Sequence, residues 1–502
     1  MRKQGELTRP STSNAVAGAI DIRGRDGTEV QLNARLLAAL ASRLKGDILI
    51  PSDPGFDDAA RLWNGMVRRR PALIVQPASV ADVRETVTFA LTNRILLSIK
   101  GGGHHAAGLA LADGGLTLDM SRLRNVVVEP EPRLALVGAG CRLGDVDRAT
   151  QDHGLATVLG SDADTGVAGL TLGGGFGSLS RQFGWTVDNL DEVEIVTADG
   201  EVHRAAADEN EDLFWALRGG GGNFGVVTRF TYRLHPIGPL VTSGLMLWDA
   251  SVAERVLETY RKVTEAAPRE LMVALTMRLA PQADAVPERL RGRPVVGVLA
   301  CHTGDPARVA HDLAPFRDIE AAVDTIGRKR YVDHQHVMGF PQPAGSHQYW
   351  KSEFLPQLRD GFLQAYRRQA EAISSPMSQL ILFQLGGAIG DREAGATAMG
   401  NRDARYIFLA AGAWSPGDPD RDQHLGWVRS TWQALSPYSS GGNYVNAHNG
   451  DEEEERTQAA YRDGYERLRQ VKSRYDPDNF FCTNRNIPPA SQQDGAVRDQ
   501  IR

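Results

Sequence analysis

The spacing of apolar residues divides the chain into three regions. Residues 35–67 place apolar side chains at helical intervals, first in LLAALASRL and then in DDAARLWNGMV, which predicts two helices. From Pro71 to about residue 235, short apolar runs such as ALIVQP and ILLSIKGGG alternate with helical segments and predict one compact α+β unit. From 236 to 440 the apolar runs are longer, which predicts one broad, mainly antiparallel sheet with helices covering one face.

Local signals sharpen this α+β description. Ser79 stands where the N-cap of the helix SVADVRETVTFALTN is expected, because its hydroxyl can accept a bond from a free backbone N–H. The dipeptide Asp199-Gly200 predicts a tight turn between the two strands of a hairpin. Near the other end, the acidic run Asp451–Glu455 predicts the solvated start of a helix, where acids suit the helix dipole.

Composition narrows the class of protein. Glycine supplies 53 of 502 residues, above the average of about 7%. Glycine and proline together remain below the level of disordered chains, so the extra glycine belongs at particular places in a folded protein. A hydrophobic content of 42% and a net charge of -6 indicate a globular chain without a basic footprint, which argues against a nucleic-acid partner. No apolar window is long enough for a membrane span.

The cysteines and the N-terminus indicate a cytoplasmic protein. Cys141, Cys301 and Cys482 lie far apart in the sequence, so neither a disulfide framework nor a CxxC metal site is predicted. Their odd number fits a reducing compartment. The first residues lack the apolar stretch of a signal peptide, and we expect them to form a flexible lead.

The extra glycine gathers in three clusters, at residues 101–103, 173–177 and 219–225. Each cluster lies at the edge of a predicted element, where glycine allows positive φ and lets backbone N–H groups approach a ligand. Such turns form nests for a phosphate or diphosphate, although a plain tight turn is the alternative for any one cluster. The third cluster matches GxGxxG but follows a helix and precedes a strand, the reverse of a Rossmann site, and no GxxxxGK[ST] motif occurs.

Several long motifs around these clusters carry a family resemblance. IKGGGHHAAG (99–108), DTGVAGLTLGGGFGSLSRQFGWTVDNL (164–190) and DLFWALRGGGGNFGVVT (212–228) resemble the berberine bridge enzyme-like flavoproteins of the vanillyl alcohol oxidase/p-cresol methylhydroxylase superfamily. YVN (444–446) and RYDPDNFF (474–481) resemble the closing segment of that family.

The resemblance implies an α+β fold with a two-subdomain FAD-binding domain of the p-cresol methylhydroxylase type. This domain would span residues 51–235, after an N-terminal lead and first helix at 1–50. A substrate-binding domain at 236–440 would place its sheet over the flavin. A segment at 441–492 would return to the FAD domain, followed by a flexible tail at 493–502.

The resemblance also assigns the cofactor contacts. In this family the histidine after the first glycine cluster bonds to the flavin 8α-methyl carbon, and the resemblance gives this role to His104. A neutral imidazole is a competent nucleophile for such a bond. Many relatives add a cysteinyl bond, but Asp162 occupies that position here, so a single histidyl attachment is expected. Thr165 aligns with a position thought to gate oxygen. The residues implied in FAD binding are Gly101, Gly102, Gly103, His104, His105, Gly108, Thr165, Gly166, Gly169, Gly173, Gly174, Gly175, Gly177, Gly222, Asn223, Gly225, Val226, Val227 and Asn446.

The reaction implied is hydride transfer from a substrate carbon that bears a hydroxyl group or, less often, nitrogen, with reoxidation of the flavin by O2 to hydrogen peroxide. Tyr444 matches the tyrosine of the family's Y-x-N motif and is the candidate base, provided that a cation or hydrogen bond lowers its pKa. Its alternative role is that of a buried aromatic. Asn446 would position Tyr444 or the flavin. Gln384 resembles a family position that faces the substrate, with a plain sheet glutamine as the alternative.

Other titratable residues are weaker candidates. His334, His336, His347 and His448 could act as acids or bases, with a packing or surface role as the alternative for each. Lys351 could support a tyrosinate, although nothing in the sequence places it in the site. The pair His334-x-His336 has chelating spacing but no carboxylate or cysteine company, so no metal is assigned.

Two classes of function therefore stay open. The first is an FAD-linked oxidase of a sugar-like or natural-product substrate, with a dehydrogenase that uses another electron acceptor as its competitor, given Thr165. The second is a flavin-binding protein whose catalytic side has decayed. The expected partners are a small-molecule substrate and O2, with no nucleic acid and no membrane; the sequence leaves the oligomeric state open.

Overall fold

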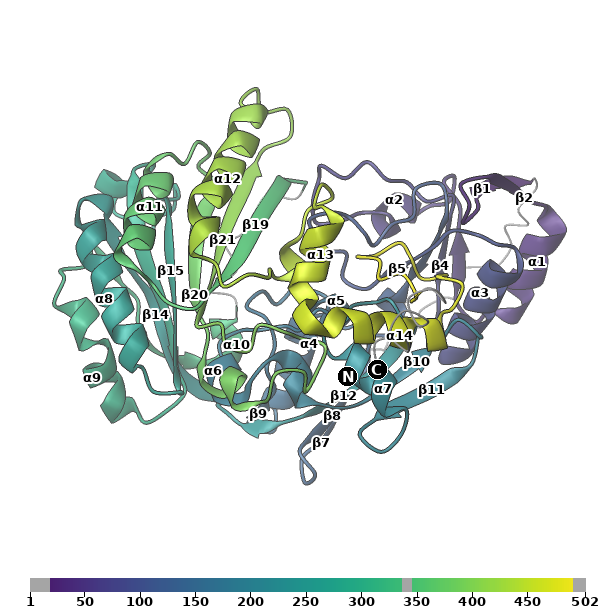
Figure 1. Ribbon diagram of the computed structural model, residues 1–502, viewed down its shortest axis with the longest axis horizontal. Helices are drawn as coiled ribbons and strands as arrows, with labels where there is room; N and C mark the ends of the chain where they lie inside the picture. The colour runs from purple at the N-terminus through teal and green to yellow at the C-terminus, as the bar shows by residue number, and fades with distance from the viewer. Residues whose placement is uncertain (1–18, 336–344, 491–502) are drawn as a thin grey trace, which may run out of the picture.

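The structure, a computed structural model, describes residues 19–335 and 345–490 and arranges them in two halves (Figure 1). One half holds two smaller sheets, and the other holds one large sheet with its helices. Ahead of them, β1 (Ile20–Arg23) and β2 (Glu29–Leu32) form a hairpin, and α1 (Ala34–Arg43) packs near α3.

The first small sheet has the strand order β3-β4-β6-β5. Strand β6 pairs in parallel with both β4 and β5, and α3 connects β4 to β5. At the start of α3 the hydroxyl of Ser79 accepts a bond from the N–H of Asp82 at 3.3 Å, which confirms the predicted cap. The loop after β5 carries the first glycine cluster. The bounds are β3 (Asp47–Leu49), β4 (Leu73–Gln76), α3 (Val80–Thr92), β5 (Leu97–Lys100) and β6 (Leu116–Asp119).

The second small sheet is antiparallel, with the order β11-β10-β12-β8-β7. The predicted hairpin joins β10 to β11, and Gly200 at its turn has φ 79°. The helix and strand predicted around the third glycine cluster are α7 and β12, which confirms the reversed order that excluded a Rossmann site. The bounds are β7 (Val126–Glu129), β8 (Leu134–Gly138), α4 (Leu143–Gln151), α5 (Val167–Leu172), α6 (Ser180–Phe183), β10 (Leu190–Val196), β11 (Val202–Ala206), α7 (Glu211–Leu217) and β12 (Val226–Arg233).

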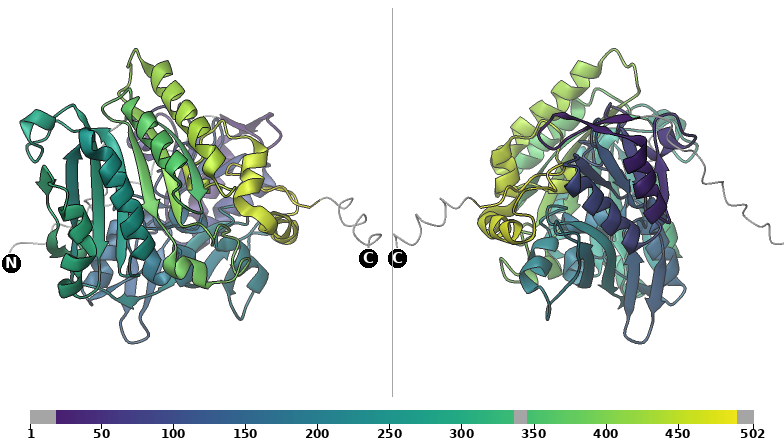
Figure 2. Two further views of the ribbon diagram at one scale, coloured as in Figure 1. Left: turned by 60° about the vertical axis from the view of Figure 1, so that its left-hand side comes forward. Right: turned by 90° about the vertical axis from the view of Figure 1, so that its right-hand side faces the viewer.

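The large sheet confirms the predicted broad antiparallel sheet. Its order is β17-β14-β16-β15-β20-β21-β19, with β18 beside β14, and its helices lie along one face (Figure 2, left). Even-numbered residues such as Leu382 and Phe408 enter the core beneath these helices, so odd-numbered residues of β20 and β21 face the other way. The strands are β14 (Leu240–Asp249), β15 (Leu271–Leu279), β16 (Pro294–His302), β17 (Val323–Asp324), β18 (Gly327–Arg330), β19 (His347–Leu355), β20 (Gln379–Gln384) and β21 (Tyr406–Trp414). The helices are α8 (Ala253–Ala266), α9 (Pro306–Arg317), α11 (Asp360–Glu371) and α12 (Arg421–Leu435).

The C-terminal segment crosses back to the first half through α13 (Glu454–Tyr461) and α14 (Tyr465–Tyr475), as Figure 1 shows. The buried ammonium group of Lys472 in α14 donates to the carbonyl oxygen of Asn223 at 2.7 Å, and the hydroxyl of Thr483 donates to the carbonyl oxygen of Leu97 at 2.7 Å. The chain thus closes on both small sheets.

Two predictions about the N-terminal part need correction. The predicted lead at 1–50 contains β3, which pairs with β4, so the first domain starts earlier than residue 51. The segment predicted as a second helix is helical only in α2 (Phe56–Ala59). Beyond it, Trp63 and Asn64 form contacts with residues distant in the sequence, and these contacts override the helical spacing of the segment.

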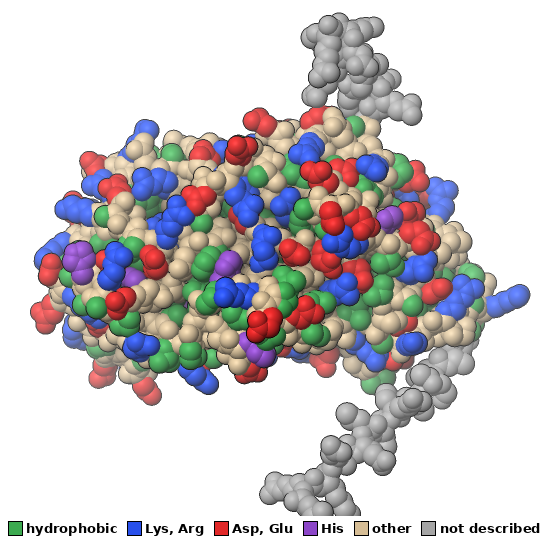
Figure 3. All heavy atoms as spheres, turned by 90° about the horizontal axis from the view of Figure 1, so that it is seen from below, with side chains coloured by type: hydrophobic (Ala, Val, Ile, Leu, Met, Phe, Trp, Pro, Cys, Tyr) green, Lys and Arg blue, Asp and Glu red, His purple; other side chains and the backbone are tan. Residues whose placement is uncertain are grey.

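The surface agrees with the weak net charge. On the face seen in Figure 3, Lys and Arg side chains lie interspersed with Asp and Glu. Among the helices of residues 19–335 and 345–490, none combines the length and apolar character needed to cross a bilayer.

A buried carboxyl group lies where α4 meets α10 (Tyr331–His334). Asp147 is 2% exposed, and the amide of Gln335 donates to its Oδ2 at 3.1 Å. Burial raises the pKa of Asp147 to about 7, against the opposing effects of this bond and of Arg148. The folded protein therefore retains a proton that the unfolded chain releases near pH 3.8.

The Asp147→Asn variant should gain stability over the wild type, and the gain should be larger at pH 8 than at pH 5. Between pH 3.8 and about 7 the unfolded chain loses this proton while the folded chain keeps it, so the wild type loses stability as pH rises. Melting temperatures of both proteins at the two pH values measure the effect. Asp152 is exposed, so Asp152→Asn serves as the control. An equal gain in the melting temperature of Asp147→Asn at both pH values would contradict the prediction.

Candidate functional site

A cavity of about 430 Å³ lies at the junction of the two halves and the C-terminal segment. Its floor is built from residues 101–105, 160–173 and 221–227, which include parts of all three glycine clusters. Its roof is the helix-free face of β19, β20 and β21. Residues 444–447 and 483–485 close one side, so segments from the whole length of the chain meet here.

Several glycines border the cavity at places where a side chain would intrude. A β-carbon built on Gly169 meets no atom within 4 Å, and one on Gly222 finds its nearest neighbour 4.0 Å away, so both would project into open space. Gly102 and Gly166 lie back to back, since a β-carbon on Gly102 would lie 2.4 Å from the nitrogen of Gly166. Bare backbone therefore faces the cavity, an arrangement that suits a bound phosphate or diphosphate.

Most residues assigned to the cofactor from the sequence line this cavity. They are Gly101, Gly102, Gly103, His104, His105, Thr165, Gly166, Gly169, Gly173, Gly222, Asn223, Gly225, Val227 and Asn446.

Five assigned residues lie outside the lining of the cavity, and their assignment as cofactor contacts stays a prediction: Gly108, Gly174, Gly175, Gly177 and Val226. The four glycines serve close packing instead. For example, a β-carbon on Gly174 would lie 2.6 Å from the sulfur of Met399, and one on Gly177 would lie 2.0 Å from a backbone oxygen. Val226 alternates with Val227 along β12, and its side chain is buried in the core.

His104 sits on the cavity floor between an aromatic ring and a carboxylate. Its imidazole stacks on the indole of Trp63, with ring centroids 4.7 Å apart. Nε2 lies 3.7 Å from Oδ2 of Asp162. Burial lowers the pKa of His104, while Asp162 acts in the opposite direction. The imidazole is therefore neutral near pH 7, as a nucleophilic nitrogen must be.

The neighbouring His105 has both ring nitrogens occupied by the protein. Nδ1 accepts a bond from the N–H of Ala107 at 3.1 Å, and Nε2 donates to the carbonyl oxygen of Val445 at 3.3 Å. Burial, assisted by the charge of Arg485, lowers the pKa of His105 to about 4. His105 thus holds the turn that follows Tyr444, and His104 is the one of the two with a nitrogen to offer.

Tyr444 and Asn446 lie together on the side wall of the cavity. Nδ2 of Asn446 donates to the phenol oxygen of Tyr444 at 2.9 Å and to the carbonyl oxygen of Leu170 at 3.1 Å, so Asn446 positions Tyr444 as expected. Burial nevertheless raises the pKa of Tyr444 to about 12. At neutral pH Tyr444 is a neutral phenol that can donate a hydrogen bond, and the candidate role as base is not supported.

Gln384 does not face the cavity, so that prediction is wrong. Its Nε2 donates to the carbonyl oxygen of Thr264 in α8 at 2.9 Å, and its Oε1 accepts from the N–H of Val273 at 3.2 Å. The reason is the two-residue period of a strand: Gln384 lies on the helix-covered face, whereas Gln379, five positions earlier on β20, lines the cavity.

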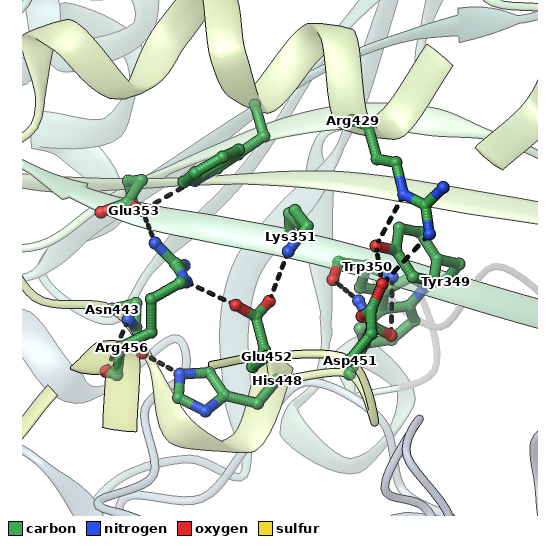
Figure 4. Close-up of polar contacts among 12 residues, drawn as sticks. Tyr349, Trp350, Lys351, Glu353, Arg429, Asn443, His448, Asp451, Glu452 and Arg456 are labelled. Carbon is green, nitrogen blue, oxygen red and sulfur yellow. Dashed lines mark hydrogen bonds and ion pairs between the residues drawn. The ribbon is translucent and has the colours of Figure 1, made fainter. Parts of the chain in front are cut away.

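A buried ion network holds the C-terminal segment against the outer face of β19 (Figure 4). Glu452 pairs with Lys351 at 2.8 Å and with Arg456, which in turn pairs with Glu353 at 2.6 Å. The side chain of Glu452 is 1% exposed, so the predicted solvation of the acidic run at 451–455 fails at this position. Lys351 pairs with Glu452 in this network and lies outside the lining of the cavity that Tyr444 borders. It is therefore not placed to support a tyrosinate at Tyr444.

The same segment covers the free edge of β19. The amide of Asn449 accepts from the N–H of Trp350 at 3.2 Å and donates to its carbonyl oxygen. The side-chain amide of Asn64 makes the same two bonds to Gln348: its oxygen accepts from the backbone N–H at 3.0 Å, and its nitrogen donates to the carbonyl oxygen at 2.9 Å. Two asparagines from opposite ends of the chain thus hold the edge of the large sheet over the cavity.

Two of the remaining histidine candidates, His334 and His448, are held by hydrogen bonds away from the cavity. Nε2 of His334 bonds the hydroxyl of Ser178 at 2.6 Å, and the buried His448 bonds Asn443 beside the ion network (Figure 4). Neither these two nor His347 lines the cavity, and His336 lies outside the described residues. No group of three or more metal-type side chains comes together in residues 19–335 and 345–490.

Comparison with known proteins decides the family. A model described as FAD binding domain matches residues 71–206, and a second, described as berberine and berberine like, matches residues 443–488. The (R)-6-hydroxynicotine oxidase of Paenarthrobacter nicotinovorans is 30% identical over 465 residues, which cover 89% of this chain and 97% of that protein. The chain belongs to the berberine bridge enzyme-like FAD-linked oxidoreductases.

Other berberine bridge enzyme-like proteins match over similar lengths. An FAD-linked oxidoreductase of Dictyostelium discoideum is 30% identical over 436 residues, covering 85% of this chain and 91% of that one. The crystal structure of 6-hydroxy-D-nicotine oxidase from Arthrobacter nicotinovorans superposes with a TM-score of 0.78 at 27% identity, over 89% of this chain and 98% of that one. Physcomitrella patens BBE-like 1 superposes with a TM-score of 0.81 at 25% identity, over 91% and 100% of the chains.

Membership confirms the expected fold class and the enzyme class, and it names FAD as the cofactor. The glycine-bordered floor fits this cofactor, because its bare backbone leaves room for a diphosphate. Sequence reasoning missed a number of residues that line the cavity, among them Trp63, Trp350 and Gln379. Strand periodicity could have indicated that only one of Gln379 and Gln384 faces the substrate side.

Proposed function

We propose that this berberine bridge enzyme-like protein is an oxidase that uses FAD and O2 to oxidise a small molecule at an amine carbon or, less readily, at a C–OH carbon. The observation that carries the proposal is the single cavity that joins the glycine-bordered floor to the face of the large sheet, so cofactor and substrate can meet within it. When bound at this floor, FAD would supply the redox chemistry, which is acceptance of a hydride from the substrate carbon and reoxidation by O2 to hydrogen peroxide.

The titratable groups on the roof and the side wall of the cavity support an amine rather than an alcohol. Loss of hydride from an alcohol needs a base for the hydroxyl proton, whereas a neutral amine uses its own lone pair. Tyr444 is a neutral phenol, and both nitrogens of His105 are engaged. Among the described residues of the roof, at 348–352, 377–383 and 407–413, the lining includes no carboxylate, lysine, arginine or histidine. A similar protein, (R)-6-hydroxynicotine oxidase, is likewise named for a nitrogen-containing substrate.

The attachment of FAD follows from the same floor. We propose a single covalent bond from His104 to the flavin 8α-methyl carbon. Support comes from the neutral imidazole of His104, its place on the cavity floor and the engagement of both His105 nitrogens. Asp162 borders the cavity where relatives carry cysteine, and it offers no sulfur for a second bond.

Oxygen uptake tests the proposed activity. Purified yellow protein is mixed with a panel of neutral secondary and tertiary amines and matched alcohols, and O2 consumption and peroxide are followed. Amine-dependent uptake supports the proposal. Turnover only with an artificial electron acceptor would favour a dehydrogenase. This alternative follows from Thr165 on the cavity floor, which aligns with the position thought to gate oxygen. Flavin that no compound reduces would favour a decayed enzyme.

Tyr444→Phe should slow the anaerobic reduction of bound flavin by an active substrate about tenfold, the worth of one hydrogen bond. Because Tyr444 is a phenol with a pKa of about 12, the pH profile of reduction between pH 6 and 9 should keep its shape. Stopped-flow absorbance measures both. A loss of about a hundredfold or more, together with loss of the rising limb of the profile, would show instead that Tyr444 is the base.

A further inference from the structure

Three residues on adjacent strands shape the middle of the cavity roof. Trp350 of β19 pairs with Ala411 of β21, which pairs with Gln379 of β20, and all three line the cavity. Neighbouring strands lie about 4.8 Å apart, so the indole and the amide stand on backbones about 10 Å apart with only a methyl group between them. We call this gap, formed by Trp350, Ala411 and Gln379, the Ala411 slot.

Gln379 presents a fixed hydrogen-bond donor at one side of the slot. Its Oε1 accepts a bond from the hydroxyl of Thr276 at 3.3 Å, which orients the amide. Its Nε2 has no acceptor among the described residues, although Gln379 is only 9% exposed. This N–H group borders the cavity without an acceptor from the protein, so a ligand that brings an acceptor is favoured at this point.

The rest of the roof offers little to a polar or charged ligand. On the next rung, Ser352, Leu409 and Ile381 pair across the same three strands, and the hydroxyl of Ser352 is buried away from the cavity surface. At the other side, the amide oxygen of Gln348 already accepts from the indole N–H of Trp350 at 3.2 Å. The roof is thus apolar around one free donor.

We infer that the Ala411 slot holds an uncharged aromatic ring that carries a hydrogen-bond acceptor, and that it selects substrates of this class over sugars and carboxylates. The ring lies over the methyl group of Ala411 against the indole of Trp350, and its acceptor takes the bond from Nε2 of Gln379. A sugar would leave several hydroxyl groups without partners, each at a cost of roughly tenfold in affinity. This inference rests on the proposed function and narrows its substrate.

Binding of simple probes to the flavin-loaded protein tests the slot. Acetophenone has a ring and an acceptor, ethylbenzene has nearly the same shape without the acceptor, benzoate adds a charge, and glucose is a polyol. Titration calorimetry should show acetophenone binding about tenfold more tightly than ethylbenzene, the worth of one hydrogen bond. Benzoate and glucose should bind more weakly than either.

Two variants locate the effect. Gln379→Leu should remove the advantage of acetophenone over ethylbenzene, and Gln379→Met provides a second side chain of similar length with the same expected result. Ala411→Leu should fill the slot and weaken both ring probes by about tenfold or more. Ile381→Val, on the same face of β20, is the matched control and should leave the ratio of the two affinities unchanged.

The outcomes separate this inference from the proposed function. Equal affinity for glucose and acetophenone, or an unchanged ratio in both Gln379 variants, would overturn the Ala411 slot as the recognition site. Flavin absorbance recorded on each sample shows that the cofactor site is intact. A wild-type protein that carries no flavin would overturn the proposed function instead, and the same titrations would still report on the slot.

Discussion

Replacing His104 with alanine will release the flavin from the denatured protein. In the wild type, acid precipitation should leave a yellow pellet, because the proposed bond from His104 survives unfolding. In His104→Ala the colour should move to the supernatant, since both nitrogens of the neighbouring His105 are engaged and Asp162 offers no sulfur for a second bond. The mass of the intact denatured protein should fall by that of FAD in addition to the change of side chain.

Two further variants control this experiment. His105→Ala should keep its yellow pellet, because both nitrogens of His105 are bonded within the protein. Asp162→Asn should keep it as well, since the carboxylate only neighbours the imidazole at 3.7 Å. A colourless wild-type pellet, or a yellow pellet from His104→Ala, would rule out attachment through this histidine.

Replacing Glu452 with glutamine will lower the free energy of unfolding by about 3–5 kcal/mol, the usual consequence of leaving a buried charge without its partner. Glu452 is shared by Lys351 and Arg456, and the loss of its charge leaves these two cations with Glu353 alone. Thermal melting followed by circular dichroism, together with a denaturant titration, measures the loss.

The neighbouring residue offers a matched control. Glu453 is exposed, so Glu453→Gln should melt within error of the wild type. The double variant Glu452→Gln/Lys351→Met restores neutrality around Arg456 and Glu353 and should recover part of the loss. Equal melting temperatures for the Glu452 and Glu453 variants would show that the network does not stabilise the protein.

Features with a local cause could be predicted from the sequence. The helix after Ser79 starts where its capping hydroxyl lies, and the hairpin turns at Asp199-Gly200. The broad sheet follows from long apolar strands that need a helical cover. The glycine clusters marked the floor of the cavity, although only the structure separates glycines that border the cavity from those, such as Gly177, that permit close packing.

The errors share one physical origin, which is contact between residues distant in the sequence. Helical spacing after residue 60 gave way because Trp63 stacks on His104. The solvated acid expected at Glu452 is buried because Lys351 of a distant strand meets it. Strand periodicity places Gln379 and Gln384 on opposite faces, but the face that borders the cavity is decided by where the helices pack.

The two asparagine caps on β19 bear on whether the large sheet can exist alone. An open strand edge is a template on which another chain adds a strand, and natural proteins cover such edges. Here the cover for Gln348 and Trp350 comes from Asn64 and Asn449, which both lie outside residues 236–440. A fragment of 236–440 produced by itself would expose this edge and self-associate. The half built on the large sheet therefore depends on both ends of the chain to cover its edge strand.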